Sequence, residues 1–370
     1  MDNQKQAFEE ELKAENEVFK CPGCGANLTF EPEQEELTCQ YCDYHVRLKG
    51  TSSQQEFDFF GAEDVKNTWN NEMKILHCQN CGANNVVEKK IISYECPFCG
   101  TAQVTDSEEL PGLRPQRVLP FSVNKETTIK LYQNWIKRRF FAPKKLKKDI
   151  PNAKINGVYL PVWTYDAETF TSYRGRLGKR YTRTVGTGKN RRVVTEIRYF
   201  SISGTKYVSF DDIVVSASRK ISQGQITQLQ PFNTNSSYLY DPRYLSGFSA
   251  EHYDISLKEG FNKAKEIAKK RIEQLILARY NYDVVSYLHT NTTYDQVKYK
   301  YVLIPVWICS FDYNKKTYRY YVNGETGRLV GSAPVSVGRV LLIVFLVLAV
   351  IALIVILFMS FGTTSYYPYP

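Results

Sequence analysis

The sequence predicts an α+β chain with two small four-cysteine modules, a mixed, mainly β domain with a few helices, and one C-terminal transmembrane helix. Three observations predict this class. Eight of the nine cysteines form a repeat near the N-terminus, an unbroken apolar segment lies near the C-terminus, and the 14% aromatic content is enough for a buried core between them. We expect, in order, a helical lead-in (1–20), a first cysteine module (21–49), a linker (50–73), a second module (74–104), a linker (105–117), a basic aromatic domain (118–335), a transmembrane helix (340–360) and a short outer tail (361–370).

The cysteines of the two modules follow one spacing. Cys21-x2-Cys24 is followed after fourteen residues by Cys39-x2-Cys42, and the same arrangement recurs 57 residues later. Each Cys-x2-Cys turn places two thiolates on one side of a loop, and two facing turns complete a tetrahedral site with Zn–S distances of about 2.3 Å. The predicted ligands of two structural zinc ions are Cys21, Cys24, Cys39, Cys42, Cys78, Cys81, Cys96 and Cys99.

Two other uses of these cysteines fit the pattern less well. Disulfides or unrelated thiols do not require a duplicated spacing, and residues 1–20 lack the apolar core of a secretory signal. A rubredoxin-like iron site uses the same turns but a longer separation, so the spacing favours zinc. Because four thiolates fill each site, no position is left for catalysis, and His45 and His77 are interpreted as bystanders.

Net charge differs sharply between the two parts of the chain. The whole chain carries +10, but residues 1–110 contain 21 Asp and Glu against 9 Lys and Arg, whereas residues 111–370 contain 17 against 39. Phosphate binding needs basic side chains, and the cysteine modules are acidic. The modules are therefore expected to contact protein rather than nucleic acid.

The apolar segment Val340–Met359 contains twenty residues and no polar side chain. As a helix it spans about 30 Å, the thickness of the hydrocarbon core of a bilayer. Arg328 and Arg339 precede it, and the tail that follows carries no charged residue. The positive-inside rule therefore predicts a single-pass protein of the cell membrane with its N-terminal domains in the cytoplasm, where thiols stay reduced.

Between the modules and the apolar segment, the sequence predicts two amphipathic helices and several strands. One helix begins after a cap at Asn124, and the other covers Ser256–Arg279 with Ser256 and Glu259 as a capping box. Alternation predicts strands at Gly157–Asp166, Arg191–Ser203, Tyr207–Val215 and Lys298–Asp312, with a chain reversal at Gly175 and a hairpin of Tyr318–Val322 with Leu329–Val330.

A short motif occurs twice in this domain. Leu160–Trp163 and Ile304–Trp307 both have the pattern aliphatic-Pro-Val-Trp, which indicates two related β units. Trp163 and Trp307 are expected to be buried core residues rather than ligand platforms.

A basic cluster lies just after the first helix. Its members are Lys137, Arg138, Arg139, Lys144, Lys145, Lys147 and Lys148. The cluster suits a solvated face, contact with anionic lipid headgroups, or contact with nucleic acid; no RNP motif or helix-turn-helix signal accompanies it.

The sequence gives no support for catalysis. Gly186–Lys189 resembles a fragment of a phosphate-binding loop, but Arg183 and Asn190 occupy positions where that loop requires glycine and Ser or Thr. No His-Glu-x-x-His or Gly-x-Ser-x-Gly motif is present. We therefore expect a protein that is not an enzyme.

Several motifs resemble those of a bacterial membrane-anchored double zinc-ribbon family, often labelled TFIIB-type zinc-ribbon protein or primosomal protein N′. They are Leu119–Phe121, Trp135, Phe141–Pro143, Gly157–Thr164, Tyr240–Phe248 and Leu303–Trp307. The resemblance covers nearly the whole chain, and it implies a link to phage-shock-type membrane-stress systems. The helicase activity suggested by the second label is not expected here, because the ATP-binding loop is missing.

These observations lead to two functional hypotheses. The first is a membrane-anchored, zinc-binding adaptor that recruits cytoplasmic partners, such as phage-shock or related membrane-stress components, to the lipid bilayer. The second, less favoured, is a membrane-tethered nucleic-acid-binding protein that uses the basic cluster at 137–148.

Overall fold

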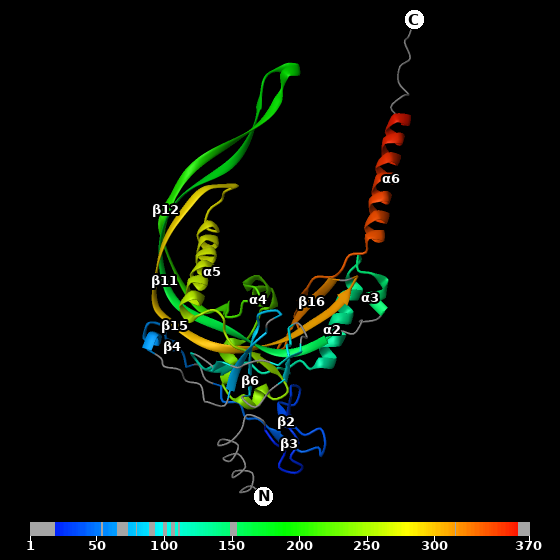
Figure 1. Cartoon of the computed structure of the whole chain (residues 1–370). Helices are drawn as coiled ribbons and strands as arrows, with labels where there is room; N and C mark the ends of the chain where they lie inside the picture. Colours follow the sequence, from blue (N-terminus) through cyan, green and yellow to red (C-terminus); the bar gives the residue numbers. More distant parts are fainter. Residues whose placement is uncertain are drawn as a thin grey trace.

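The structure is a computed structural model with a mixed α+β fold dominated by one large sheet, as predicted (Figure 1). It describes residues 19–52, 55–64, 73–78, 80–88, 93–98, 102–104, 108–109, 112–148, 154–314 and 316–361. The predicted lead-in (1–20), except for its last two residues, and the tail from 362 onward lie outside this part of the chain.

The strands are β1 (Thr29–Glu31), β2 (Glu36–Thr38), β3 (His45–Arg47), β4 (Phe57–Asp58), β5 (Met73–His77), β6 (Asn84–Glu88), β7 (Ser93–Glu95), β8 (Ala102–Val104), β9 (Glu108–Glu109), β10 (Arg117–Val118), β11 (Lys154–Val185), β12 (Arg192–Ser216), β13 (Tyr238–Leu239), β14 (Ser249–Glu251), β15 (Val284–Tyr313), β16 (Lys316–Asn323) and β17 (Leu329–Gly331). The α-helices are α2 (Lys125–Arg138), α3 (Lys144–Lys148), α4 (Gln223–Leu229), α5 (Leu257–Leu277) and α6 (Val337–Phe361).

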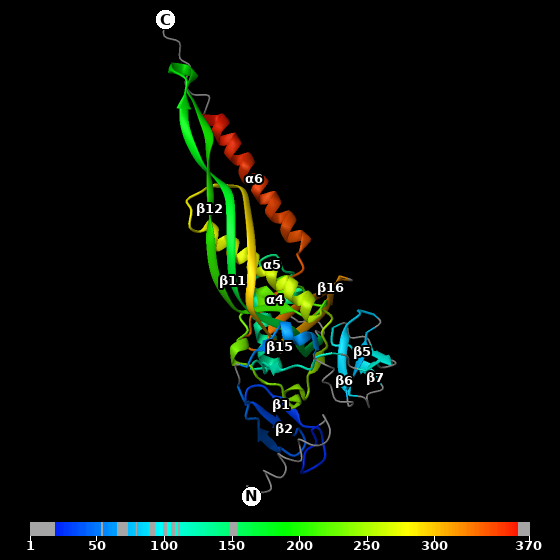
Figure 2. The same cartoon turned by 90° about the vertical axis from the view of Figure 1, so that its left-hand side faces the viewer.

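Three very long strands form the centre of the sheet. β11 lies between β12 and β15 and pairs with both in antiparallel register. The three strands leave the body as a curved arm, and α5 packs inside the curve (Figures 1 and 2). A buried cluster of Tyr173, Leu177, Ile202, Ile272 and Ile276 joins the arm to α5. Beyond Gly178, where β15 begins, the arm continues as a two-stranded ribbon.

The predicted chain reversal at Gly175 is wrong, because β11 continues through this residue to Val185. A Cβ atom at Gly175 would lie 2.8 Å from the carbonyl oxygen of Tyr287 on β15. The glycine thus permits close approach of two paired strands, a use of glycine in sheets that differs from its use in turns. Likewise, the two strands predicted at 191–203 and 207–215 are one strand, β12.

The two copies of the repeated motif lie on neighbouring strands of the sheet and meet only at their first residues. Leu160 on β11 is directly opposite Ile304 on β15, so the copies run antiparallel about a local twofold relation. Both tryptophans are buried, as predicted.

Each tryptophan of the motif also secures the start of a helix. The indole N–H of Trp163 donates to the carbonyl oxygen of Ile255 at 2.8 Å, and that of Trp307 donates to the carbonyl oxygen of Val123 at 2.8 Å. These carbonyls immediately precede Ser256 and Asn124, the N-caps of α5 and α2. In each copy of the motif, the tryptophan therefore attaches the start of a helix to the strand that carries the motif.

The two cysteine modules are attached to the body in different ways. The first forms its own three-stranded sheet, β1–β2–β3. It packs through Phe30, whose ring lies 5.2 Å from that of Tyr244 and whose N–H donates to the carbonyl oxygen of Ser246. The second module extends the main sheet, because Ala250 on β14 pairs with Val86 on β6.

Residues of the predicted linker 50–73 also contact the body. β4 pairs with β15, and the carbonyl oxygen of Gln55 accepts a hydrogen bond from Arg117 at 2.9 Å. Within the described residues, the segment that connects the two modules is therefore held against the sheet by tertiary contacts.

A buried carboxyl group lies where β14 joins the second module. The side chain of Glu251 is 1% exposed, and burial raises its pKa well above the usual value. A carboxyl group with a raised pKa binds its proton more tightly in the folded state than in the unfolded state. Its contribution to the free energy of unfolding therefore falls as the pH rises above about 4.5.

We expect Glu251→Gln to remove this loss of stability. Relative to the wild type, the variant should be nearly neutral at pH 5 and more stable at pH 8, by about 1–3 kcal/mol. Thermal unfolding in detergent at both pH values measures the effect. Glu266→Gln, at an exposed position on α5, is the control. An unchanged pH dependence in Glu251→Gln would show that the carboxyl group is not the cause.

Candidate metal centres and the adjoining pocket

The first module brings its four predicted cysteines together. The Sγ atoms of Cys21, Cys24, Cys39 and Cys42 all lie within 4.8 Å of one another and can hold a metal ion. Cys21 and Cys39 are buried, whereas Cys24 and Cys42 are exposed. This group therefore lies at the surface of the module, with two of its four cysteines buried.

In the second module, the sulfur atoms of Cys78, Cys81 and Cys96 also lie within 4.8 Å of one another. The fourth predicted ligand, Cys99, lies outside the described residues. The described part therefore contains three of the four predicted thiols in an arrangement that can hold a metal.

Backbone hydrogen bonds repeat between the modules and explain the repeated residues. In the first module, the N–H of Gly25 donates to the carbonyl oxygen of Cys21; in the second, the N–H of Gly82 donates to that of Cys78. Both glycines have positive φ, 75° and 69°, which a side chain disfavours. The identical turns aim both cysteines of each pair toward one point.

The first cysteine group has an electrostatic reason to hold a cation. The backbone N–H of Tyr41 lowers the pKa of the Cys39 thiol to about 7, against an opposing effect of burial. The backbone N–H of Tyr44 lowers the pKa of Cys42, but the neighbouring cysteine thiols outweigh it and raise that pKa to about 12. Four sulfur atoms this close cannot all ionise unless a positive charge offsets their repulsion.

Neither nearby histidine belongs to a cysteine group. The Nδ1 atom of His77 lies 2.7 Å from the side-chain oxygen of Asn84, and that of His45 lies 3.2 Å from the carbonyl oxygen of Asp43.

A third polar group was not predicted from the sequence. Carboxylate oxygens of Glu56, Asp166 and Asp211 lie within 4.8 Å of one another. The buried Lys300 lies 3.4 Å from Glu56, and its Nζ is 2.7 Å from Asp212. With this ammonium group in place, we interpret the cluster as an ion-pair network that holds β4 on the sheet. Its residues are up to 244 positions apart, and no local motif marks them.

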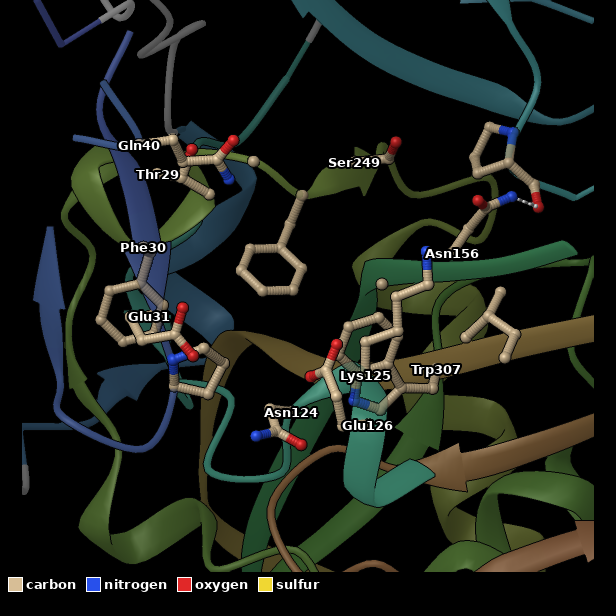
Figure 3. A pocket seen from close by; sticks show the side chains of 16 residues that line it. Thr29, Phe30, Glu31, Gln40, Asn124, Lys125, Glu126, Asn156, Ser249 and Trp307 are labelled. Atoms are coloured by element: carbon tan, nitrogen blue, oxygen red, sulfur yellow. Dashed lines mark hydrogen bonds between the residues drawn. The ribbon is translucent and has the colours of Figure 1, made fainter. Parts of the chain in front are cut away.

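A cavity of about 400 Å³ lies where both cysteine modules meet the body (Figure 3). Phe30 comes from the first module, Pro97 from the second, and Phe248 and Trp307 from the body. The Asn156 side chain donates to the carbonyl oxygen of Pro97 at 2.9 Å, which fixes the second module at this edge. The cavity is thus built from three separate parts of the chain.

The charged residues that line this cavity are two carboxylates and one lysine, and its other polar residues are neutral. Glu31 from β1 and Glu126 from the first turn of α2 line it together with Lys125 (Figure 3). Burial raises the pKa of Glu31, and repulsion from Glu126 and Glu33 adds to this effect. A cationic group placed in the cavity would relieve that repulsion.

Two glycines allow side chains to pack closely against the backbone in the wall of the cavity. A Cβ atom on Gly157 would lie 2.4 Å from the ring of Phe248, and one on Gly247 would lie 2.5 Å from the side chain of Thr29. Gly157, Phe248 and Trp307 all belong to motifs on which the family resemblance depends, although nothing in their sequence separation indicates that they share a cavity.

The basic cluster covers the end of α2, the turn that follows it and α3. Lys137 and Arg138 end α2, Arg139 stacks on Trp135 with its Cζ 4.8 Å from the ring centre, and α3 contains the four lysines at 144, 145, 147 and 148. The Nζ of Lys147 donates to the carbonyl oxygen of Lys137 at 3.1 Å.

The C-terminal helix α6 is long and apolar enough to cross a membrane. Within the segment Val337–Phe358, an 18-residue window has a mean hydropathy of 3.8, and the rest of the described chain buries none of that window. In a soluble protein such a helix would be covered by other elements.

Comparison with known proteins identifies a similar chain. The protein is 27% identical over 324 residues to the Bacillus subtilis (strain 168) protein named "Uncharacterized protein YdjG", and the match covers 87% of this chain and 91% of that one. No family model matches the sequence. No solved structure matches it significantly.

Proposed function

We propose that this protein is a membrane-anchored adaptor whose two zinc modules recruit a cytoplasmic protein to the bacterial membrane. One observation carries the proposal: the cysteine modules and α6 lie at opposite ends of one folded body (Figure 1). Such an arrangement suits a connection between a membrane and a partner, and the proposed role is binding rather than catalysis.

Zinc is the metal that we propose for both cysteine groups. Four thiolates around one point match the tetrahedral preference of Zn²⁺, and soft sulfur ligands favour it over Mg²⁺ or Ca²⁺. A site in which four cysteines fill every coordination position has a structural role, so the ions stabilise the modules that form the acidic end of the protein.

The chemistry of the cavity between the modules suggests how a partner is bound. The aromatic side chains that line it suit the aliphatic stem of a lysine or arginine, and the carboxylates of Glu31 and Glu126 suit the charged head. We therefore propose that the partner, a phage-shock or related membrane-stress component, inserts a basic side chain there.

The orientation in the membrane follows from charge. Arg328 and Arg339 precede the apolar segment, which places the body and its thiols in the cytoplasm under the positive-inside rule. The arm must stay in water as well, because residues 172–208 hold ten Lys and Arg, and its free edges would leave backbone groups unpaired in hydrocarbon. Since the arm and α6 rise from the same side of the body (Figure 1), the anchored state requires α6 to incline away from the arm.

Neutralising the cavity tests the recruitment proposal. We expect the double variant Glu31→Gln/Glu126→Gln to lower the yield of a specifically co-purified partner from detergent-solubilised membranes about tenfold or more, because charge-assisted hydrogen bonds contribute about 1.5–3 kcal/mol each. Quantitative mass spectrometry measures the yield, and zinc analysis checks that the modules remain folded.

A matched control is Glu266→Gln/Glu273→Gln, which removes two carboxylates from α5, far along the chain from the cavity. Equal partner yields from the cavity variant and the control would contradict the proposal. Salt-sensitive recovery of nucleic acid instead of a protein partner, lost when the basic cluster is neutralised, would favour the nucleic-acid hypothesis.

A further inference from the structure

The turn between α2 and α3 exposes two aromatic rings among basic side chains. Phe140 is 66% exposed and Phe141 is 41% exposed, and their rings meet edge to face at 5.4 Å. Lys137, Arg138 and Lys144, which lie on either side of them in the sequence, are also exposed. Large exposed aromatic side chains grouped with cations indicate an interaction surface rather than a solvated face.

This turn is rigidly attached to the body. Ile136 at the end of α2 and Leu146 in α3 are each 1% exposed, as is Ala142 between them. The two exposed rings are therefore held outward by a buried base rather than carried on a free loop.

The same turn is hydrogen-bonded to the start of the membrane helix. The guanidinium of Arg339 donates to the carbonyl oxygens of Phe140 at 2.5 Å and Ala142 at 2.6 Å. The N–H of Ser336 donates to the carbonyl oxygen of Phe141 at 2.8 Å. α2 and α3 accordingly lie beside the first turn of α6 (Figure 1).

The attachment fixes the depth of the turn relative to a bilayer. The uninterrupted apolar segment begins at Val340, one residue after Arg339, so this arginine lies at the boundary between headgroups and hydrocarbon. Aromatic side chains are enriched at that depth, and basic side chains there interact with anionic headgroups.

We propose that the α2–α3 turn is a binding site for anionic phospholipid headgroups, with Phe140 and Phe141 inserted at the interface and Lys137, Arg138 and Lys144 contacting phosphate. The inference rests on the proposed anchoring through α6 and adds a second membrane contact beside it. This contact would orient the body, and hence the cysteine modules, relative to the bilayer.

The occupant that the geometry favours is a bilayer rather than nucleic acid. The basic side chains flank two exposed apolar rings in the sequence, and the first turn of an apolar helix lies alongside. Phosphate groups of a bilayer come with hydrocarbon that can cover the rings, whereas the backbone of a nucleic-acid duplex would leave the rings in water.

The test uses the full chain carrying Phe140→Trp in vesicles of phosphatidylcholine alone or mixed with phosphatidylglycerol. Lipids brominated on the acyl chain quench an inserted indole, and the parent protein supplies the background from the native tryptophans. We expect quenching of the added indole to be about twofold stronger in anionic vesicles, since each basic residue strengthens contact with the charged surface.

A triple substitution then isolates the charges. Lys137→Gln/Arg138→Gln/Lys144→Gln should return the quenching to its value in neutral vesicles, whereas Lys269→Gln/Lys270→Gln/Arg271→Gln on exposed positions of α5 should leave it unchanged. Sedimentation with vesicles should be the same for all variants, because α6 still anchors them. A failure of anchoring is thus distinguished from a failure of this site.

Two results would overturn the inference. The first is equal quenching of the added indole in neutral and anionic vesicles. The second is binding of a duplex DNA oligomer to the protein in neutral vesicles, abolished by the triple substitution in the turn, which would assign the basic side chains to nucleic acid.

Discussion

Replacing Cys39 by serine is expected to reduce the zinc content by one ion per chain and to unfold the first cysteine module. The module has three strands of three residues each, and Phe30 and Leu37 are the largest fully buried side chains among them. A unit of this size buries too little apolar surface to fold without a metal or a disulfide. Structural zinc contributes about 10–16 kcal/mol in small modules, so loss of a ligand exceeds what the remaining contacts supply.

Metal analysis of the purified protein and limited proteolysis measure these two effects. Protease sites between residues 21 and 48 should become accessible, whereas the main sheet, which does not include β1–β3, should remain resistant. Cys309→Ser is the control, because Cys309 is buried on β15 and lies outside the cysteine groups of the described chain. Full zinc content in Cys39→Ser would refute a role for this cysteine as a ligand.

The features that could be predicted from the sequence are those encoded by neighbouring residues. The cysteine groups and the apolar helix follow from fixed spacings and an unbroken composition, which no distant contact can alter. The start of α5 is also encoded locally. The side chain of Ser256 accepts a hydrogen bond from the N–H of Glu259 at 3.3 Å, as expected for an N-cap residue.

The length of the arm could not be predicted, because its glycines resemble turn residues in the sequence but allow close contacts between paired strands in the structure. Gly175 and Gly204 interrupt the alternation of side chains that marks a strand. In the structure they make room for neighbours; a Cβ atom at Gly204 would lie 2.8 Å from the Tyr173 hydroxyl oxygen. A single sequence does not distinguish a glycine that permits a turn from one that permits such an approach.

The cavity and the ion-pair network could not be predicted for a related reason. Glu31 and Glu126 share the cavity although they lie far apart in the sequence, and Glu56 reaches Lys300 across most of the chain. Their meeting depends on how the first module docks on Tyr244 and how β4 pairs with β15. Only the tertiary structure brings these charges together.

Placing two arginines in α6 is expected to abolish stable insertion of the protein. About twenty apolar residues contribute roughly 0.3–0.6 kcal/mol each to insertion, or about 6–12 kcal/mol in total. An arginine at the centre of the helix costs about 2.5–3.5 kcal/mol, and it also removes an apolar side chain. Val347→Arg/Ile351→Arg should therefore remove about 6–8 kcal/mol, most of the favourable free energy of insertion, and move the protein from the membrane to the soluble or aggregated fraction.

Alkaline extraction of membranes measures this change, with Val347→Ala/Ile351→Ala as the control that keeps the helix apolar. The α2–α3 turn cannot compensate, because basic residues near an anionic surface contribute only about 1 kcal/mol each and that contribution is screened by salt. If the double arginine variant still resisted alkaline extraction, α6 would not be the anchor. If instead it remained bound only to anionic membranes at low salt, the surviving contact would be the turn itself, and the two membrane contacts would be separated experimentally.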